Sequence, residues 1–115
     1  MPDPLIIEEV RDTSASTAAY AASLIAKAGR GRAFAVFGYN SKGSAQFLQL
    51  HDSATLPADT AVPAAVITVP TLANFSFPLP PNGMDFLNGI TVSNSSTGPT
   101  KTIGSADCFI TVLYR

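Results

Sequence analysis

His51 is the only histidine of the chain, and a carboxylate, Asp52, follows it directly. A hydrolase site requires a base, a group that orients the base and a nucleophile, all within mutual reach. The two residues end a run with strand-like composition, and successive side chains of a strand point to opposite faces. Adjacency therefore does not make His51 and Asp52 a catalytic pair. We expect a surface or interface histidine in a protein that is not an enzyme.

Cys108 is the only cysteine, which excludes an intramolecular disulfide. Its apolar neighbours Phe109 and Ile110 indicate a small core residue with an inert thiol rather than a nucleophile. One histidine and one cysteine cannot supply the clustered ligands of a zinc site. A calcium loop needs several carboxylates close together, but the acidic residues beyond the N-terminal segment are dispersed: Asp52, Asp59, Asp85 and Asp107. We expect no metal and no cofactor.

The run Gly29-Arg30-Gly31-Arg32 is suggestive of contact with phosphate or RNA. No phosphate-loop pattern or base-stacking motif accompanies it. The net charge of −1 also provides no field that would attract nucleic acid or an anionic membrane. We predict a hairpin turn with two solvated arginines, and no nucleic-acid partner.

Neither a membrane span nor an export signal is expected. No run of about 18 apolar residues is present, and the first residues lack the basic region and the apolar stretch of a secretory signal. The glycosylation sequons at Asn74 and Asn94 are then chance matches. Carbohydrate binding stays open as an alternative, because Tyr20, Tyr39 and Tyr114 could stack on sugars, although tryptophan is absent.

Two strand-like runs, residues 32–39 and 45–51, flank the turn-forming sequence Asn40-Ser41-Lys42-Gly43. The turn residues predict a hairpin in which Gly43 takes a positive φ. Alternation in the second run places Leu48 and Leu50 on the inner face.

Further strands are predicted at residues 64–69, 72–79, 86–93 and 107–115, with Ile90 and Val92 inward in the third of these. Residues 52–63 are predicted to cross from one sheet to the other, and residues 12–22 lack the apolar spacing of a stable helix. Seven or eight short strands indicate an antiparallel sandwich or barrel.

The last strand is apolar on both faces. Its alternation assigns Cys108, Ile110, Val112 and Tyr114 to the core, and Phe109 and Leu113 to a partner.

The length of 115 residues fits one domain, which we divide into an N-terminal arm and linker, residues 1–22, and a β-sandwich, residues 23–115. Charged residues make up only 13% of the chain, about half the usual share. A neutral surface loses little free energy on leaving water, so we expect a homo-oligomer.

The charges that are present divide into an acidic N-terminal group and a later basic group, and they either pair between subunits or are simply solvated. The two groups are Asp3, Glu8, Glu9 and Asp12, and Lys27, Arg30, Arg32 and Lys42.

Four segments, residues 33–41, 45–52, 89–96 and 106–115, together with the Leu56-Pro and Val62-Pro connection, resemble small virion structural proteins of tailed bacteriophages. The chain looks most like their capsid decoration, or cement, proteins. The resemblance implies a jelly-roll-like β-sandwich with terminal arms, made in the host cytoplasm and bound to the outer surface of the capsid at capsomer junctions. It implies the major capsid protein as partner and favours a trimer over a dimer. A tail, neck or baseplate component and a receptor- or glycan-binding module remain alternatives.

The expected partner contacts lie in the arm, in the glycine-arginine turn and in the last strand. They are Leu5, Ile6, Ile7, Glu8, Glu9, Arg30, Arg32, Phe109 and Leu113.

Overall fold

The computed structural model describes residues 13–79 and 82–115, which form nine strands and no helix. The strands are β1 (Thr13–Ser16), β2 (Ser23–Lys27), β3 (Gly31–Asn40), β4 (Gln46–Asp52), β5 (Ala65–Val69), β6 (Ala73–Pro78), β7 (Met84–Phe86), β8 (Ile90–Ser95) and β9 (Cys108–Tyr114). In this part of the chain, no helix is long and apolar enough to cross a membrane.

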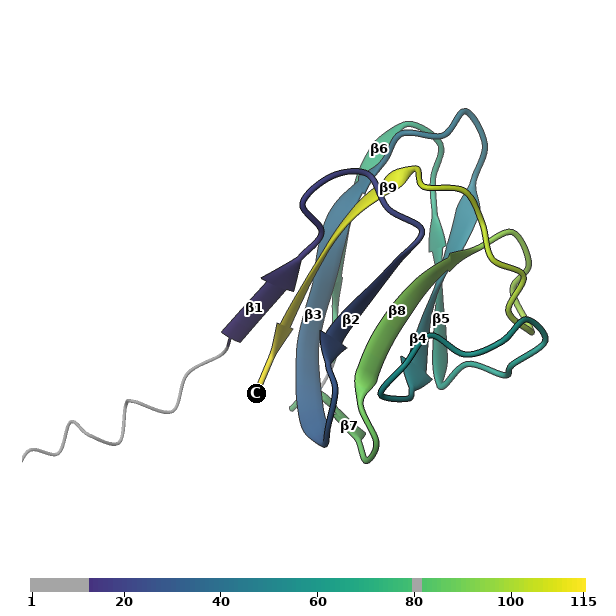
Figure 1. The fold of residues 1–115 in the computed structure, drawn as a ribbon. Coiled ribbons are helices and arrows are strands. Elements are labelled where there is room, and N and C mark those ends of the chain that lie inside the picture. Colours follow the sequence, from purple (N-terminus) through teal and green to yellow (C-terminus); the bar gives the residue numbers. More distant parts are fainter. Residues whose placement is uncertain (1–12, 80–81) are drawn as a thin grey trace, which may run out of the picture.

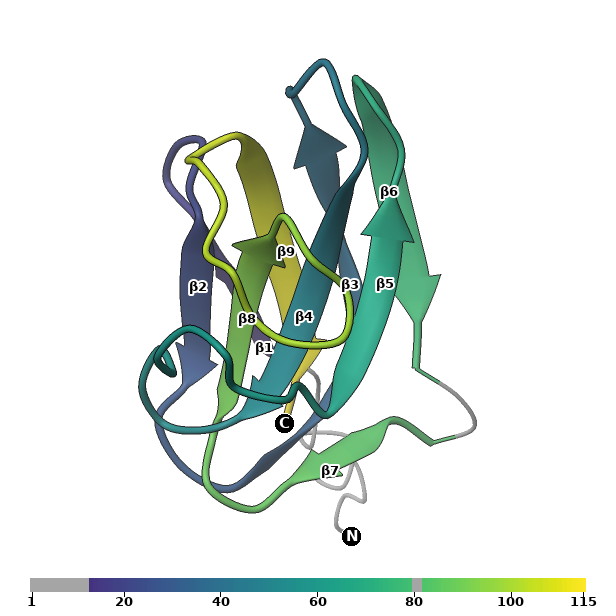
Figure 2. The same ribbon diagram turned by 90° about the vertical axis from the view of Figure 1, so that its right-hand side faces the viewer.

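The strands build two antiparallel sheets that pack against each other, which confirms the predicted β-sandwich (Figure 1). The first sheet has the order β1-β9-β3-β6, and β7 pairs with the beginning of β3. The second sheet has the order β2-β8-β4-β5. Figure 2 looks onto the second sheet, with the first sheet behind it.

The core lies between the two sheets and follows the strand alternation. Val36, Ile110 and Val112 come from the first sheet, Leu48 and Leu50 from the second, and all five are fully buried. Burial of apolar surface contributes about 25 cal/mol per Å². The burial of these side chains, and that of Ile90, Val92 and Cys108, confirms the predicted inward residues of β4, β8 and β9. Tyr114 is partly buried and packs against the core.

The predicted hairpin between β3 and β4 is wrong, because the two strands belong to different sheets. Residues 41–45 form an arch, and Gly43 does not adopt a positive φ. The buried side chain of Asn40 braces this arch: its Nδ2 donates to the carbonyl oxygens of Ser44 and Pro70, at 3.2 and 2.9 Å. Turn residues predict that the chain reverses, but they do not say which strand the returning segment will pair with.

Two other connections also differ from their predictions. The glycine-arginine turn joins β2 to β3, which lie in opposite sheets, so it is not a hairpin. Residues 53–64 join β4 to β5, which are neighbours in the second sheet, so this segment does not cross between sheets.

The N-terminal boundary of the sandwich also shifts. Residues 13–22 contain no helix, as expected, but Thr13–Ser16 pairs along its length with β9. The sandwich therefore begins no later than Thr13, within the segment that was predicted to be the linker. The expected arm contacts at residues 5–9 lie outside the described residues.

Gly38 allows β3 and β9 to approach closely. A Cβ atom at this position would overlap the backbone oxygen of Phe109, whereas a Cβ at Gly43 would have no neighbour within 4 Å. We expect Gly38→Ala to lower the free energy of unfolding by about 2 kcal/mol or more, and the matched control Gly43→Ala to change it by at most about 0.5 kcal/mol. Urea unfolding followed by circular dichroism measures both. Equal stability of the two variants would contradict the close β3–β9 approach.

Candidate functional site

The outer faces of the two sheets differ in what covers them. Residues 53–64 and 96–107 form two loops that lie over the outer side of the second sheet (Figure 2). The loops hold each other: the N–H of Thr60 donates to the oxygen of Lys101 at 2.7 Å, and the N–H of Lys101 donates to the oxygen of Ala61 at 2.8 Å. Lys101 Nζ also binds Asp59 Oδ1 at 2.6 Å. The loops therefore act as one fixed cover.

This cover buries the polar outer side chains of β4. Gln49 Nε2 donates to the carbonyl oxygens of Thr97 and Gly98, at 2.9 and 2.8 Å. His51 is only 2% exposed. The prediction of a surface histidine is therefore wrong, because strand alternation identified the outer face correctly but the loop that covers it could not be foreseen.

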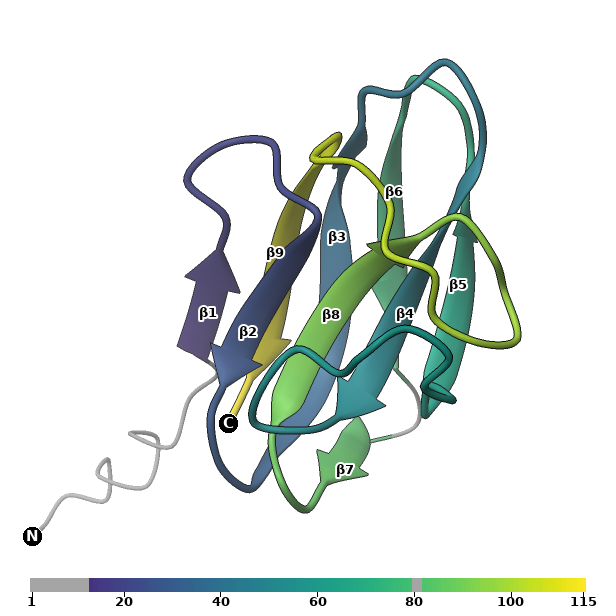
Figure 3. The ribbon, with the colours of Figure 1, turned by 45° about the vertical axis from the view of Figure 1, so that its right-hand side comes forward.

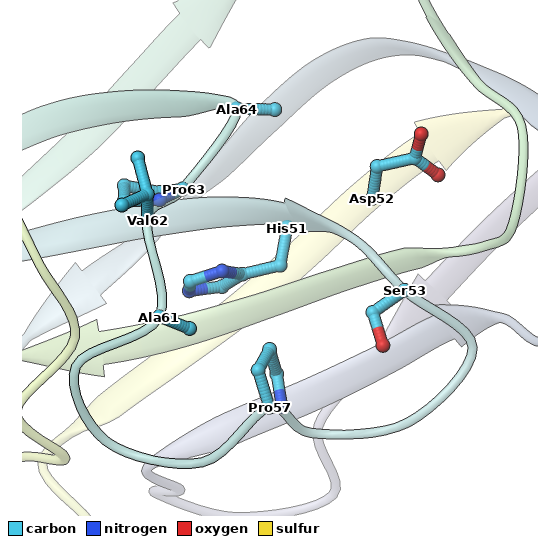
Figure 4. Close-up of a pocket in the computed structure, with 8 residues that line it drawn as sticks. All are labelled: His51, Asp52, Ser53, Pro57, Ala61, Val62, Pro63 and Ala64. Carbon is cyan, nitrogen blue, oxygen red and sulfur yellow. The ribbon is translucent and has the colours of Figure 1, made fainter.

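The imidazole of His51 has one hydrogen-bond partner among the described residues, since Nε2 lies 3.1 Å from Ser93 Oγ. Asp52 does not orient it: Asp52 Oδ1 accepts the N–H of Asn88 at 2.7 Å, and its carboxylate points away from the ring (Figure 4). Ser93 is fully buried. A histidine–serine contact that lacks an orienting acid and has an inaccessible hydroxyl does not make a nucleophilic site.

Burial and the charge of Lys101 both lower the pKa of His51, which favours the neutral imidazole. Burial, with a smaller effect from the neighbouring Asp107, raises the pKa of the Cys108 thiol to about 11. A protonated, buried thiol is a poor nucleophile, in agreement with the core position predicted for this residue. Within residues 13–79 and 82–115, no three potential metal ligands gather.

Apart from the ion pair of Arg32 with Asp85 at the β7 end, the outer face of the first sheet carries no charge on its strands. We call it the open face, and define it by the alternate residues of β1, β9, β3 and β6 that point away from the core. They are Ser14, Ser16, Phe109, Thr111, Leu113, Ala35, Phe37, Tyr39, Asn74, Ser76 and Pro78.

Aromatic side chains form the centre and one end of the open face. Phe37 and Phe109 are 37% and 40% exposed. Tyr39 is the register partner of Phe109, and Tyr20, from the β1–β2 loop, packs on Phe109 with a ring distance of 4.3 Å. The two loops of the cover lie on the opposite side of the molecule (Figure 3).

Phe109 and Leu113, two of the predicted contact residues, lie on this open face. Arg32 lies on the same outer side of the first sheet but at its β7 end, where it forms an ion pair with Asp85 at 3.0 Å and donates to the oxygen of Asn82 at 2.7 Å. Arg30 is exposed in the β2–β3 turn. The expected contacts Leu5, Ile6, Ile7, Glu8 and Glu9 lie outside the described residues.

The basic residues do not form one patch. Lys42 follows the end of β3, while Lys27, Arg30 and Arg32 are near its beginning, and ten strand residues span about 33 Å. The three tyrosines do not form one sugar platform either. Tyr114 faces the core side with Lys27 Nζ 5.9 Å from its ring centre, apart from Tyr20 and Tyr39.

Sequence reasoning did not identify Phe37 as part of a surface. The alternation of Ala35, Phe37 and Tyr39 was present in the sequence. Their membership of one surface with Phe109 depends on the pairing of β3 with β9, which the sequence did not predict.

The fold and the site define a β-sandwich in which loops cover one sheet, and the other sheet presents an outer face whose only strand charges are the paired Arg32 and Asp85. A scan of protein-family models and searches of curated proteins and of solved structures find no match to this chain.

The neutral state of His51 predicts a pH dependence of stability. Its folded pKa lies below the ordinary value of 6.5, so between these two values the unfolded chain binds more protons than the folded chain, and stability rises with pH. The stabilisation is complete above about 6.5 and is lost as the pH falls through the folded pKa. Because His51 is the only histidine, we expect His51→Gln to lose less stability than the unmodified chain between pH 7.5 and 5. Urea unfolding at both pH values measures this, and equal losses would contradict it.

Proposed function

We propose that this chain is a virion structural protein of a tailed bacteriophage, and specifically a capsid decoration protein that binds the outer capsid at capsomer junctions and stabilises the head. The observation that carries the proposal is the open face. The sequence resemblance and the sandwich architecture support the same assignment.

A decoration protein stabilises the head by burying surface between neighbouring capsomers. Such burial contributes about 25 cal/mol per Å² of apolar area, and it is opposed by the cost of removing charges from water. None of the residues that define the open face carries a charge to desolvate, and the exposed rings of Phe37 and Phe109 supply apolar area. Protein interfaces are likewise enriched in aromatic residues and depleted of charge at their centres.

We also propose that the sandwich is a jelly roll. In support, the successive pairs β1/β2, β3/β4, β5/β6 and β8/β9 are each divided between the two sheets, and each sheet has four principal strands. Jelly rolls of eight strands occur in viral capsid and lectin domains. Since fold alone does not determine function, the open face and the resemblance carry the functional assignment.

We propose the major capsid protein and further copies of this chain as partners, with a trimer favoured over a dimer because local three-fold positions suit decoration proteins. A tail, neck or baseplate role uses the same features and remains an alternative. A receptor- or glycan-binding module is the second candidate, favoured by the cluster of Tyr20, Phe109 and Tyr39 at one end of the open face.

A charge on the open face is expected to separate the subunits without unfolding them. An unpaired carboxylate buried in the interface would cost about 3 kcal/mol or more, so Leu113→Asp and Phe37→Asp should weaken self-association at least about a hundredfold. The control Val66→Asp, an exposed position on β5 of the second sheet, should leave association unchanged. Analytical ultracentrifugation measures the three variants, with melting curves as the test of folding.

Ile110 is the core-facing comparison for these variants, because it lies on the opposite face of β9 and is fully buried. Ile110→Asp should unfold the domain. Intact oligomers in both open-face variants, or unfolding as severe as that of Ile110→Asp, would show that the open face is not the interface.

The location of the protein in the particle tests the functional assignment directly. We expect a cryo-EM map of the virion to show density for this chain on the outside of the head, at capsomer junctions. Density confined to the tail or baseplate would replace the decoration role with the alternative virion role. Absence of the chain from purified particles would overturn both.

A further inference from the structure

A hollow of about 310 Å³ lies on the outer side of the second sheet, under residues 53–64 (Figure 4). Its walls are mostly aliphatic and include Pro57, Ala61, Val62 and Pro63. This volume is at the lower end of the range for ligand pockets, about 300 to 1,000 Å³. It is therefore large enough for one small organic molecule.

His51 supplies the polar group of the hollow. Figure 4 shows its ring directed toward the part of the loop that carries Ala61 and Val62. The side chain is 98% buried, the complement of its 2% exposure, and Ser93 binds Nε2, while no described residue hydrogen bonds to Nδ1. Nδ1 is not one of the fully buried polar atoms that lack a partner, so it is accessible and can hydrogen bond with a ligand in the hollow.

The other polar groups around the hollow already have partners. Ser53 Oγ donates to the oxygen of Thr55 at 2.7 Å, Asp52 accepts the N–H of Asn88 at 2.7 Å, and Lys101 is paired with Asp59 at 2.6 Å. Burial also keeps the imidazole neutral by lowering its pKa. The one charged side chain in the wall is Asp52, whose carboxylate points away from the His51 ring (Figure 4). An anionic ligand would therefore find no counter-charge here, and the chemistry beside the ring suits an uncharged one.

The wall of the hollow is held in a strained conformation. Thr60 precedes Ala61 in the wall and has a φ of 78°, which is rare for a β-branched residue. The hydrogen bond from the N–H of Thr60 to Lys101 keeps the loop in this shape. Strain of this kind persists where the surrounding structure maintains a particular geometry, and it often does so at binding sites.

We propose that this hollow binds a small uncharged molecule with an aliphatic body and one hydroxyl or carbonyl group, which hydrogen bonds to Nδ1 of His51. The site lies on the sheet opposite the open face, so it is separate from the proposed capsid contact. Its test is also independent of whether the chain belongs to a virion.

The single histidine makes the test direct, because only one imidazole contributes ring signals to the NMR spectrum. Cyclohexanol is the probe, added to the full chain, and its charged analogue cyclohexanecarboxylate is the control. We expect cyclohexanol to shift the His51 ring signals saturably, and cyclohexanecarboxylate to bind at least about tenfold more weakly. The absence of a saturable shift, or equal binding of the two probes, would overturn the proposal.

Two matched variants test whether cyclohexanol binds in the hollow. Ala61→Phe fills the hollow and should weaken cyclohexanol binding at least about tenfold, while Ala58→Phe introduces the same side chain at an exposed position of the same loop, outside the hollow, and should leave binding unchanged. Equal affinity in both variants would overturn the proposal. If Ala61→Phe does not fold, intermolecular NOEs between cyclohexanol and the His51 ring in the unmodified chain decide the question, and their absence counts against the site.

Discussion

The pairing of β3 with β9 is the interaction on which the rest of the structure depends. It joins residues 33–40 to residues 108–114 in antiparallel orientation, with one register shift between Ala33 and Ala35. The inner side of this pair supplies Val36, Ile110 and Val112 to the core, and the outer side supplies Phe37, Phe109 and Leu113 to the open face. One set of backbone hydrogen bonds therefore determines both the stability of the sandwich and the composition of its uncovered surface.

The second sheet uses its outer side differently. Its polar residues are buried because two long loops lie over them, and Lys101 links these loops with a side chain that is only 3% exposed. Burying a lysine is costly unless its charge is paired, and Asp59 provides that partner. The hydrogen bond from Lys101 correspondingly lowers the pKa of the Asp59 carboxyl. The cover and the hollow beneath it thus depend on Lys101, through this ion pair and through its backbone hydrogen bonds to Thr60 and Ala61.

The two proposals use these two sides separately. Attachment to a capsid needs a broad surface without charge, and the open face provides that on the first sheet. Binding of a small uncharged molecule needs a concave site with one available hydrogen-bonding group, and the hollow at His51 provides that on the second sheet. A particle-bound subunit with its open face buried would still present the hollow on its opposite sheet.

Much of the fold could be predicted from the sequence because strand alternation is a local property of the backbone. The composition indicated an all-β chain with few charges, and alternation placed Leu48, Leu50, Ile110 and Val112 in the core and Phe109 on the outside. The inert position of Cys108 also followed from its immediate neighbours. None of these results requires knowledge of which strands pair.

Only the tertiary structure decided which segments meet. Turn residues after β3 predicted a hairpin, but β3 pairs instead with β9, and β1 also pairs with β9 although their bonded side chains Ser16 and Thr111 are 95 positions apart. The burial of His51 depended on a loop whose path no local pattern specifies. The physical reason is that a turn or an alternation is determined by adjacent residues, whereas sheet order and loop cover depend on the packing of distant segments into one core.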